Sequence, residues 1–348
     1  MKKNRKVTIK DVAERANVSI TTVSLVLNNK SSTISKETIE KVKKCAYEIN
    51  YFPDPIAASM ITKKTKTIGY ILPNIENTFF AKIVKSVETE LISNGYNLII
   101  SNSNESFERD KKAIMLLNRR NVDFLIYTPS IESLQKENIN KINDLLSSID
   151  TPYLLVDREI LGLDCNKIVS DNEYGGYLAT RHLIENGHKS IACISGPLEV
   201  SSAFNRYNGY LKALKEAGID NNDKLLLIGN YSFESGYELG LELIKRRGVT
   251  AVFVTNDLMA YGVIKACKEH KIKIPNDLSI VGYDDLFYSA ILEVPLTSVN
   301  QNVGLIAKRV SDYVFNALKN KTVLDSDVEK ILIQPKLVIR NSVANKVL

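Results

Sequence analysis

Short apolar runs alternate with amphipathic stretches along residues 66–348. The runs are rich in β-branched and aromatic residues, and the stretches between them repeat apolar residues at helical spacing. This alternation predicts parallel sheets with helices on both faces. The expected strands are 67–72, 98–101, 124–127, 153–156, 191–195, 251–255 and 279–283, and the expected helices lie near 80–94, 107–120, 174–186, 204–217, 235–247 and 258–270.

The expected strands are too many for one compact sheet of this type, so we predict an α/β domain of two lobes. Ligands of such sheets bind beyond the carboxyl ends of the strands. A bound ligand is therefore expected in the cleft between the lobes.

The first fifth of the chain differs from the rest in charge. Residues 1–66 contain 14 Lys and Arg against 6 Asp and Glu, a net charge of +8 in a chain whose total is +6. A small basic domain on a near-neutral body is typical of nucleic-acid binding. A solvated lysine-rich tail is the alternative, and the apolar periodicity decides between the two.

Three short helices are expected in this basic segment, after the capping residues Thr8, Ser19 and Ser35. A tight turn at 17–19 separates the first two. This is the pattern of an all-α helix-turn-helix head, whose second helix enters the major groove. A three-helix protein-interaction module is the alternative, and the +8 charge disfavours it.

The second helix supplies most of the expected DNA contacts. Short hydroxyl and amide groups suit phosphates, while side chains at the helix start reach base edges. The residues expected at base edges are Ile20, Thr21 and Leu25, and those expected at phosphates are Ser19, Thr22, Ser24 and Asn28.

A short helix is expected over 55–61, because Asp54 is a good N-cap and Pro55 suits the first helical position. A helix of this length is marginal alone in water, so it requires a partner or a surface. A basic linker with Lys63, Lys64 and Lys66 follows it.

The N-terminal stretches 8–13, 18–19, 22–28 and 51–53 closely resemble the start of LacI/GalR-family regulators. The resemblance adds Thr8 and Tyr51 to the expected DNA contacts. It also implies that 55–61 is a hinge helix that pairs in the minor groove of a dimer's operator. Met60 then matches the residue that wedges into the central base step, and Ala57 faces the groove floor.

One position departs from the family pattern. The family usually has Arg where this chain has Leu25. Arginine is the commonest reader of guanine, whereas leucine has no hydrogen-bond donor and touches a thymine methyl at most. We therefore expect an operator that differs from the family's common half-site at this position.

The remainder resembles the periplasmic-binding-protein-like sensor domain of the same family. The resemblance implies three crossings between the lobes, which we place near 162–166, 291–296 and 322–330. The expected organisation is a head at 1–52, a hinge and linker at 53–65, and an effector-binding and dimerisation domain at 66–348, with an N-lobe of about 66–163 and 294–325 and a C-lobe of about 164–293 and 326–348. The matching stretches are 71–74 with 79–80, 156–158, 171–172, 182–188, 196–197, 205–206 with 209–210, 255–257, 282–285, 295–299 and 337–340.

Six residues of this domain are expected to bind an effector. Arg206, Asn256 and Asp284 lie at strand ends or helix starts and offer donors and acceptors to a polar, hydroxyl-rich molecule. Phe79 and Phe80 are suited to stacking on a sugar or base, and Asp157 is a further candidate. The alternative is structural: Asn256 and Asp284 cap helices, and Phe80 packs in the core.

Motifs for enzymatic, metal or cofactor chemistry are missing from the sequence. It has no Gly-rich phosphate loop, no His-Glu-x-x-His and no Gly-x-Ser-x-Gly. The four cysteines are far apart beside apolar stretches, which indicates buried free thiols. The histidines His182 and His188 are interpreted as structural. We therefore predict no catalytic residue, no metal and no cofactor.

No apolar run is long enough for a membrane span, and no signal core follows the basic start, so we expect a cytoplasmic protein. A solute-binding protein of the same sensor fold is a remote alternative, which the basic head disfavours.

The sequence thus predicts a transcriptional repressor that binds a pseudo-palindromic operator as a homodimer, or as a tetramer, under control of a sugar or related metabolite. In the alternative version, a corepressor or a phosphorylated protein partner promotes DNA binding. Sequence alone leaves the sign of the coupling open.

Overall fold

The computed structural model describes residues 7–28, 33–52, 64–220, 222–319 and 328–346. The chain divides into two compact units, Met1–Thr65 and Lys66–Leu348, each with its own core. The expected hinge helix, including Ala57 and Met60, lies outside the described residues. Its formation and the wedge role of Met60 stay predictions.

The head contains the three expected helices, α1 Ile9–Ala16, α2 Ile20–Leu27 and α3 Lys36–Glu48. The carboxylate of Asp11 accepts hydrogen bonds from the backbone N–H and the hydroxyl of Thr8, both at 2.7 Å. The Oγ atoms of Ser19 and Ser35 accept from backbone N–H groups three residues on, so both caps are confirmed. The buried core of the head is Val12, Ala13, Ala16, Val23, Val26, Val42 and Ala46.

The first lobe of the second unit is built on a parallel sheet. In the described part of the chain this sheet has six strands, in the order β11-β5-β4-β3-β1-β2. The strands are β1 Thr67–Leu72, β2 Asn97–Asn102, β3 Phe124–Tyr127, β4 Tyr153–Val156, β5 Lys167–Ser170 and β11 Lys330–Ile333.

The second lobe has a mixed sheet, in which the described residues form six strands in the order β12-β10-β9-β8-β6-β7. Only β12 runs antiparallel to its neighbour among these described pairs. The strands are β6 Ile191–Ser195, β7 Leu226–Ile228, β8 Ala251–Val254, β9 Ser279–Tyr283, β10 Thr297–Asn300 and β12 Lys336–Val338.

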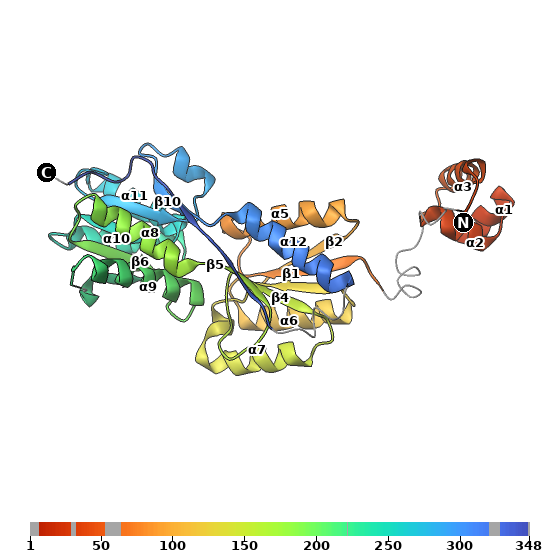
Figure 1. The fold of residues 1–348 in the computed structure, drawn as a ribbon, viewed down its shortest axis with the longest axis horizontal. Helices are drawn as coiled ribbons and strands as arrows, with labels where there is room; N and C mark the ends of the chain where they lie inside the picture. Colours follow the sequence, from red (N-terminus) through yellow and green to blue (C-terminus); the bar gives the residue numbers. More distant parts are fainter. Residues whose placement is uncertain (1–6, 29–32, 53–63, 221, 320–327, 347–348) are drawn as a thin grey trace, which may run out of the picture. The chain divides into compact units, whose positions relative to one another are not determined.

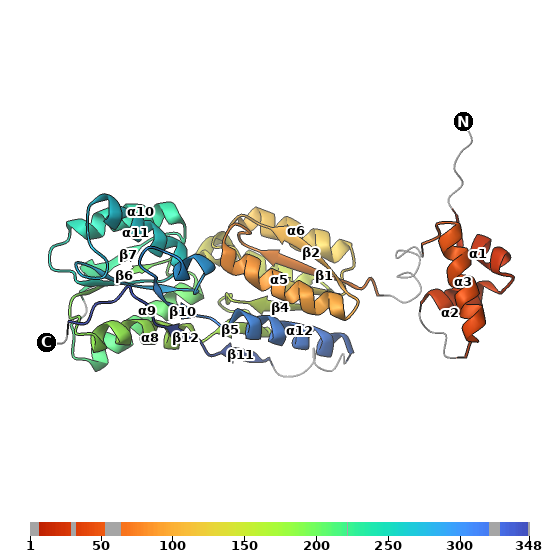
Figure 2. The same cartoon turned by 90° about the horizontal axis from the view of Figure 1, so that it is seen from above.

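Helices cover both faces of each sheet, as the alternation predicts (Figure 1). Figure 2 shows α5 and α12 side by side along the first lobe. In the first lobe the helices are α5 Thr78–Ser93, α6 Phe107–Arg119, α7 Lys136–Ser148 and α12 Val303–Lys319. In the second lobe they are α8 Asn172–Glu185, α9 Ser201–Glu216, α10 Phe233–Lys245 and α11 Asp257–Glu269.

The expected positions of the three crossings were wrong by several residues. β5 and β11 pair with each other in the first sheet, whereas β10 belongs to the second. The chain therefore crosses after β5, after β10 and between β11 and β12, where the dark-blue C-terminal ribbon runs between the lobes (Figure 1). The physical reason is that the chain forms one more short strand before each crossing. These strands are 167–170 and 330–333 in the first sheet and 297–300 in the second. The lobe boundaries near 163, 294 and 326 shift accordingly.

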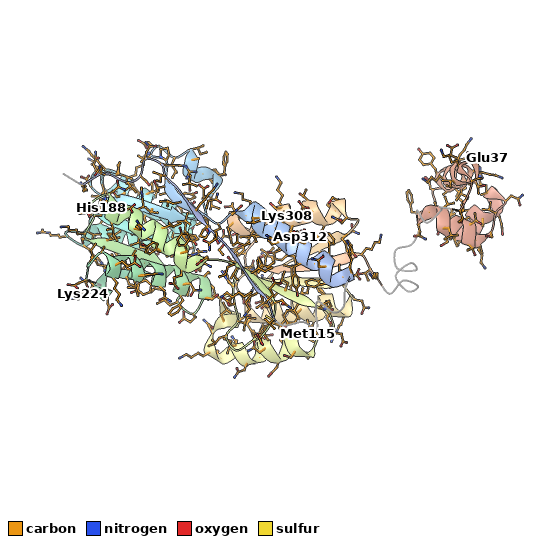
Figure 3. All side chains as sticks on the ribbon, in the orientation of Figure 1. Glu37, Met115, His188, Lys224, Lys308 and Asp312 are labelled. Atoms are coloured by element: carbon orange, nitrogen blue, oxygen red, sulfur yellow. The ribbon has the colours of Figure 1, made fainter. Side chains whose placement is uncertain are left out.

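Three of the four cysteines are buried free thiols, as expected, whereas Cys45 is half-buried. His188, labelled in Figure 3, has a structural role: its ring nitrogens contact Thr250 Oγ1 at 3.0 Å and the carbonyl of Ala344 at 3.2 Å. Among the helices that the structure describes, none has the length and apolar character needed to cross a membrane.

Candidate functional site

A small polar cavity lies between the two lobes, and the empty space in it and at its open mouth amounts to about 280 Å³. The first lobe contributes the start of α5 and the end of β4, and the second contributes α9 and the ends of β8 and β9. All six predicted effector residues line it: Phe79, Phe80, Asp157, Arg206, Asn256 and Asp284. The structure therefore brings them together at the carboxyl ends of the strands, where parallel sheets bind ligands.

Two of these residues have an unusual backbone conformation. The φ angles are +70° at Asp157 and +106° at Asp284, a region that side-chain-bearing residues seldom occupy. Each such residue costs about 1–3 kcal/mol and persists where the surrounding structure fixes it, as ligand sites often do. The strained backbone after β4 and β9 therefore places the carboxyl groups of Asp157 and Asp284 at the cavity.

Arg206 is held rigidly by the second lobe. Its Nε donates to Asn172 Oδ1 at 2.8 Å, and its Nη1 donates to the carbonyl of Thr255 at 2.7 Å. The guanidinium lies 3.8 Å from the ring centroid of Tyr283, and its Nη1 is 3.9 Å from Asp284 Oδ1. A buried cation with fixed geometry is thus placed at the cavity wall.

Asp157 has a carboxylate oxygen, Oδ1, that is buried and has no hydrogen-bond partner among the described atoms. Burial raises the pKa of Asp157, and the nearby Arg206 and Arg158 oppose this shift. Buried polar groups are nearly always paired, so an unpaired acceptor beside a cavity indicates a ligand that supplies a donor.

Burial raises the pKa of Asp284 to about 8, although Arg206 counteracts part of the shift. Because the unfolded value is near ~3.9, the folded chain holds this proton between pH ~4 and ~8. This contribution to stability is complete at low pH and is lost as the pH rises through the folded pKa.

We expect Asp284→Asn to flatten the fall in melting temperature of the full chain between pH 6 and 8.5. The asparagine stays neutral, so it removes a dependence of at most about 1.4 kcal/mol per pH unit. Thermal unfolding of both proteins across this range measures the effect. Parallel pH profiles would show that Asp284 does not titrate in it.

Asn256 both lines the cavity and caps a helix, so the structural alternative for this residue is confirmed as well. Its Oδ1 accepts from the backbone N–H of Met259 at 3.1 Å, which caps α11, and its Nδ2 donates to the carbonyl of Tyr231 at 3.0 Å. Phe80 likewise lines the cavity and packs in the core of the first lobe. Asp284 caps no helix and instead accepts from Gln301 Nε2 at 2.6 Å.

A buried carboxylate supports the loop that carries Asp284. Asp257 Oδ2 accepts from the backbone N–H of Leu286 at 2.8 Å and from Ser289 Oγ at 2.6 Å, and its Oδ1 accepts from Ser298 Oγ at 2.7 Å. Asp257 thus fixes the turn after β9 without lining the cavity itself.

Sequence reasoning missed four cavity residues: Asn77, Arg158, Ser202 and Tyr231. Arg158 directly follows the strand end at Asp157, so the rule that located Asp157 also indicates it. Ser202 lies in the first turn of α9, which was expected to begin at residue 204. Tyr231 follows β7, a strand too short for its pattern to stand out.

The head presents its predicted reading helix to solvent. Ile20 is 43% exposed, Thr21 and Ser19 are exposed, and Leu25 is half-buried. Ser19 and Thr22 share a hydrogen bond at 2.9 Å, and Asn28 Nδ2 donates to the carbonyl of Ser24 at 2.8 Å. The remaining contact candidates are Thr8, which is exposed, and Tyr51, which is half-buried against the head core.

Two family profiles match the chain. Residues 8–54 match "Bacterial regulatory proteins, lacI family", and residues 180–343 match "Periplasmic binding protein-like domain". The HTH-type transcriptional repressor PurR of Histophilus somni (strain 2336) is 37% identical over 337 residues, which cover 97% of this chain and 98% of that protein.

Solved structures agree with this match. The lac repressor dimer bound to operator and the anti-inducer ONPF is 28% identical, with a TM-score of 0.85 and coverage of 98% of this chain and 100% of that one. The transcriptional regulator CelR–cellobiose complex is also 28% identical, with a TM-score of 0.72 and coverage of 97% and 99%.

The helix-turn-helix head and the two-lobed sensor define a DNA-binding transcriptional regulator. The chain belongs to the LacI family of bacterial regulatory proteins. Its relatives are transcriptional repressors rather than enzymes, and this class accounts for a head with exposed polar groups and a polar cavity between two lobes.

Proposed function

We propose that this repressor binds a pseudo-palindromic operator as a homodimer and that a small polar ligand, a sugar or related metabolite, controls it from the cavity between the lobes. The observation that best supports a bound ligand is that six predicted effector residues line one cavity: Phe79, Phe80, Asp157, Arg206, Asn256 and Asp284. Aromatic rings with a few fixed polar groups are typical of small-molecule sites.

The similar proteins support both halves of the proposal. CelR was solved with cellobiose, and the lac repressor was solved as a dimer on its operator. In the proposed mechanism the ligand prefers one arrangement of the lobes and thereby shifts the equilibrium between DNA-binding and non-binding states. The hinge at 53–65, with Met60 as the wedge, transmits this shift to the head.

The proposal is tested in two linked steps. Operator sequences are selected from random DNA by gel shift, and the full chain is then screened by thermal shift against sugars, sugar phosphates and nucleobases. A ligand at 100-fold its dissociation constant adds about 2.7 kcal/mol to stability. The ligand found must also change operator affinity, and release or tighter binding then separates an inducer from a corepressor. Failure of every ligand to alter operator affinity would contradict the proposal.

We expect Leu25→Arg to change the selected operator at one position in each half-site, towards guanine. A guanidinium adds a bidentate contact worth about 1–3 kcal/mol of discrimination, which leucine lacks. Tyr47→Arg, at a position 84% exposed on α3, adds the same charge outside α2 and should leave the selected sequence unchanged. An unaltered site in the Leu25 variant would show that residue 25 does not face the bases.

A further inference from the structure

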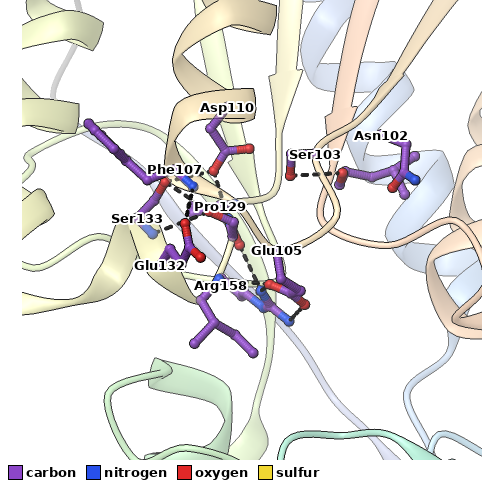
Figure 4. A network of polar contacts seen from close by, with 12 residues as sticks. Asn102, Ser103, Glu105, Phe107, Asp110, Pro129, Glu132, Ser133 and Arg158 are labelled. Atoms are coloured by element: carbon purple, nitrogen blue, oxygen red, sulfur yellow. Dashed lines mark hydrogen bonds and ion pairs between the residues drawn. The ribbon is translucent and has the colours of Figure 1, made fainter.

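Arg158, at the cavity wall, is locked to a carboxylate outside the cavity lining. Its Nη1 donates to Glu105 Oε2 at 2.8 Å and its Nη2 donates to Glu105 Oε1 at 2.9 Å, as Figure 4 shows. Nη1 also donates to the carbonyl of Pro129 at 2.8 Å. Such a two-point pair is the strongest and most directional arrangement of an arginine with a carboxylate.

Glu105 is itself fixed from several sides. Its Oε2 accepts from the backbone N–H of Ile131 at 2.7 Å, and its own N–H donates to the carbonyl of Pro73 at 2.8 Å. Asn104 and Glu105 have φ angles of +49° and +56°, two consecutive left-handed residues that are not glycine. This strain costs free energy, and it is retained where it places a functional side chain.

Few hydrogen-bond donors of the Arg158 guanidinium remain for a ligand. It lies 5.5 Å from the ring centroid of Phe80 in the first lobe and 5.9 Å from that of Tyr231 in the second. Nε is buried and has no hydrogen-bond partner among the described atoms. Three of the five N–H groups of Arg158 are thus in hydrogen bonds to Glu105 and Pro129, and Glu105 matches its charge.

The charges around the cavity do not suit an anion. Among the described residues that line it or pair with its lining, two guanidinium groups, Arg158 and Arg206, face the carboxylates of Glu105 and Asp157, while Asp284, whose pKa is raised to about 8, adds no charge at neutral pH. The lining therefore offers a phosphate no net positive charge, and of its two guanidinium groups Arg158 is already matched by Glu105. A hydroxyl-bearing neutral molecule, by contrast, supplies the donor that Asp157 Oδ1 lacks.

We propose that Glu105 is a specificity-determining residue: by holding and neutralising Arg158, it makes the cavity select neutral, donor-rich ligands and reject their phosphorylated forms. This inference rests on the proposed effector site. Glu105 acts through Arg158 and touches no ligand, so it is a positioning residue whose removal converts Arg158 into an anion-binding group.

Inorganic phosphate is the probe, because it reports a freed cation without knowledge of the effector. In low-salt buffer, we expect the Glu105→Gln full chain to bind phosphate roughly tenfold more tightly than the wild type, by calorimetry and thermal shift. A charged hydrogen bond is stronger than a neutral one by about this factor. The basic head is the same in both proteins, so their difference isolates the cavity.

Three variants separate charge from structure. Glu132→Gln neutralises a glutamate of the same network that accepts from the backbone N–H of Phe107, and it should behave like the wild type. Glu105→Asp keeps the charge and should restore phosphate rejection. Arg158→Gln, added to Glu105→Gln, should abolish the gain. Equal phosphate binding by wild type and Glu105→Gln, or a gain that survives loss of Arg158, would overturn the inference.

A wild-type measurement covers the case in which Glu105→Gln does not fold. Ribose and glucose should stabilise the wild-type chain more than ribose 5-phosphate and glucose 6-phosphate do, and the reverse order overturns the inference. If neither class acts on the wild type while Glu105→Gln gains phosphate binding through Arg158, the sugar effector fails and the role of Glu105 stands.

Discussion

Replacing Arg206 with alanine will abolish the effector response of operator binding, while operator affinity without ligand stays intact. Arg206 is 3% exposed and is anchored by Asn172, Thr255 and the ring of Tyr283 beside Asp284. Its loss removes the fixed donors of the second lobe from the cavity. The measurement is a gel shift on the selected operator with and without the ligand found by thermal shift.

The control for Arg206 has to separate ligand recognition from misfolding. Arg206→Ala leaves the buried acceptors of Asn172 and Thr255 without their donor, at a cost of about 1–3 kcal/mol each, so it will also lower the melting temperature. Arg206→Lys keeps a cation near Asp284 but loses the planar fork, and we expect it to fold and still respond poorly. Arg181→Ala, in an exposed pair with Glu185 on α8, should respond normally. A normal response in Arg206→Ala would remove Arg206 from the site.

Asp257→Ala will lower the free energy of unfolding by roughly 3 kcal/mol or more and will impair effector binding although Asp257 does not line the cavity. The substitution leaves the donors of Leu286, Ser289 and Ser298 without their acceptor, and each unpaired buried group costs about 1–3 kcal/mol. Burial raises the pKa of Asp257 to about 6, so relief of its desolvation offsets part of this loss.

Denaturant unfolding of the full chain measures the Asp257 effect. Asp312→Ala is the matched control: this carboxylate is 48% exposed on α12, 3.8 Å from Lys308, and both are labelled in Figure 3. Exposed pairs contribute about 0–1 kcal/mol, so its loss should be small. Similar losses in the two variants would show that the buried network behind Asp284 does not stabilise the fold.

The strands and helices that sequence predicts best are those with strong periodicity and clear caps. The head helices begin after the expected caps, and the strands at 67–72, 124–127, 153–156, 191–195 and 279–283 have the expected bounds. Five of the described strands were missed, and all are short: β5, β10 and β11 have four residues each, and β7 and β12 have three, too few to show a pattern. Two of the described helices were missed. α7 fully buries only Ile142 and Leu146, so its pattern is weak, whereas α12 was missed although Ile306, Val310 and Val314 form a clear apolar face.

Site residues could be predicted from the sequence where they directly follow a strand or begin a helix. Asp157, Asn256 and Asp284 follow this rule, and all line the cavity. Glu105 could not be located in this way, because its relation to Arg158 depends on a loop between β2 and α6 that folds back beside β4. Contacts between residues 53 positions apart arise from tertiary packing, which periodicity does not record.

The threefold passage of the chain between the lobes has a consequence for synthesis. The first sheet is completed by β11, which leaves the ribosome only after the whole of β6 to β10 in the second sheet. The second sheet is completed by β12, which pairs with β10 and follows β11 by a few residues. Neither lobe is formed by one continuous segment, and the short stretch from β11 to β12 adds the edge strand of both sheets. Assembly of the sensor is therefore a late, joint event rather than a stepwise one.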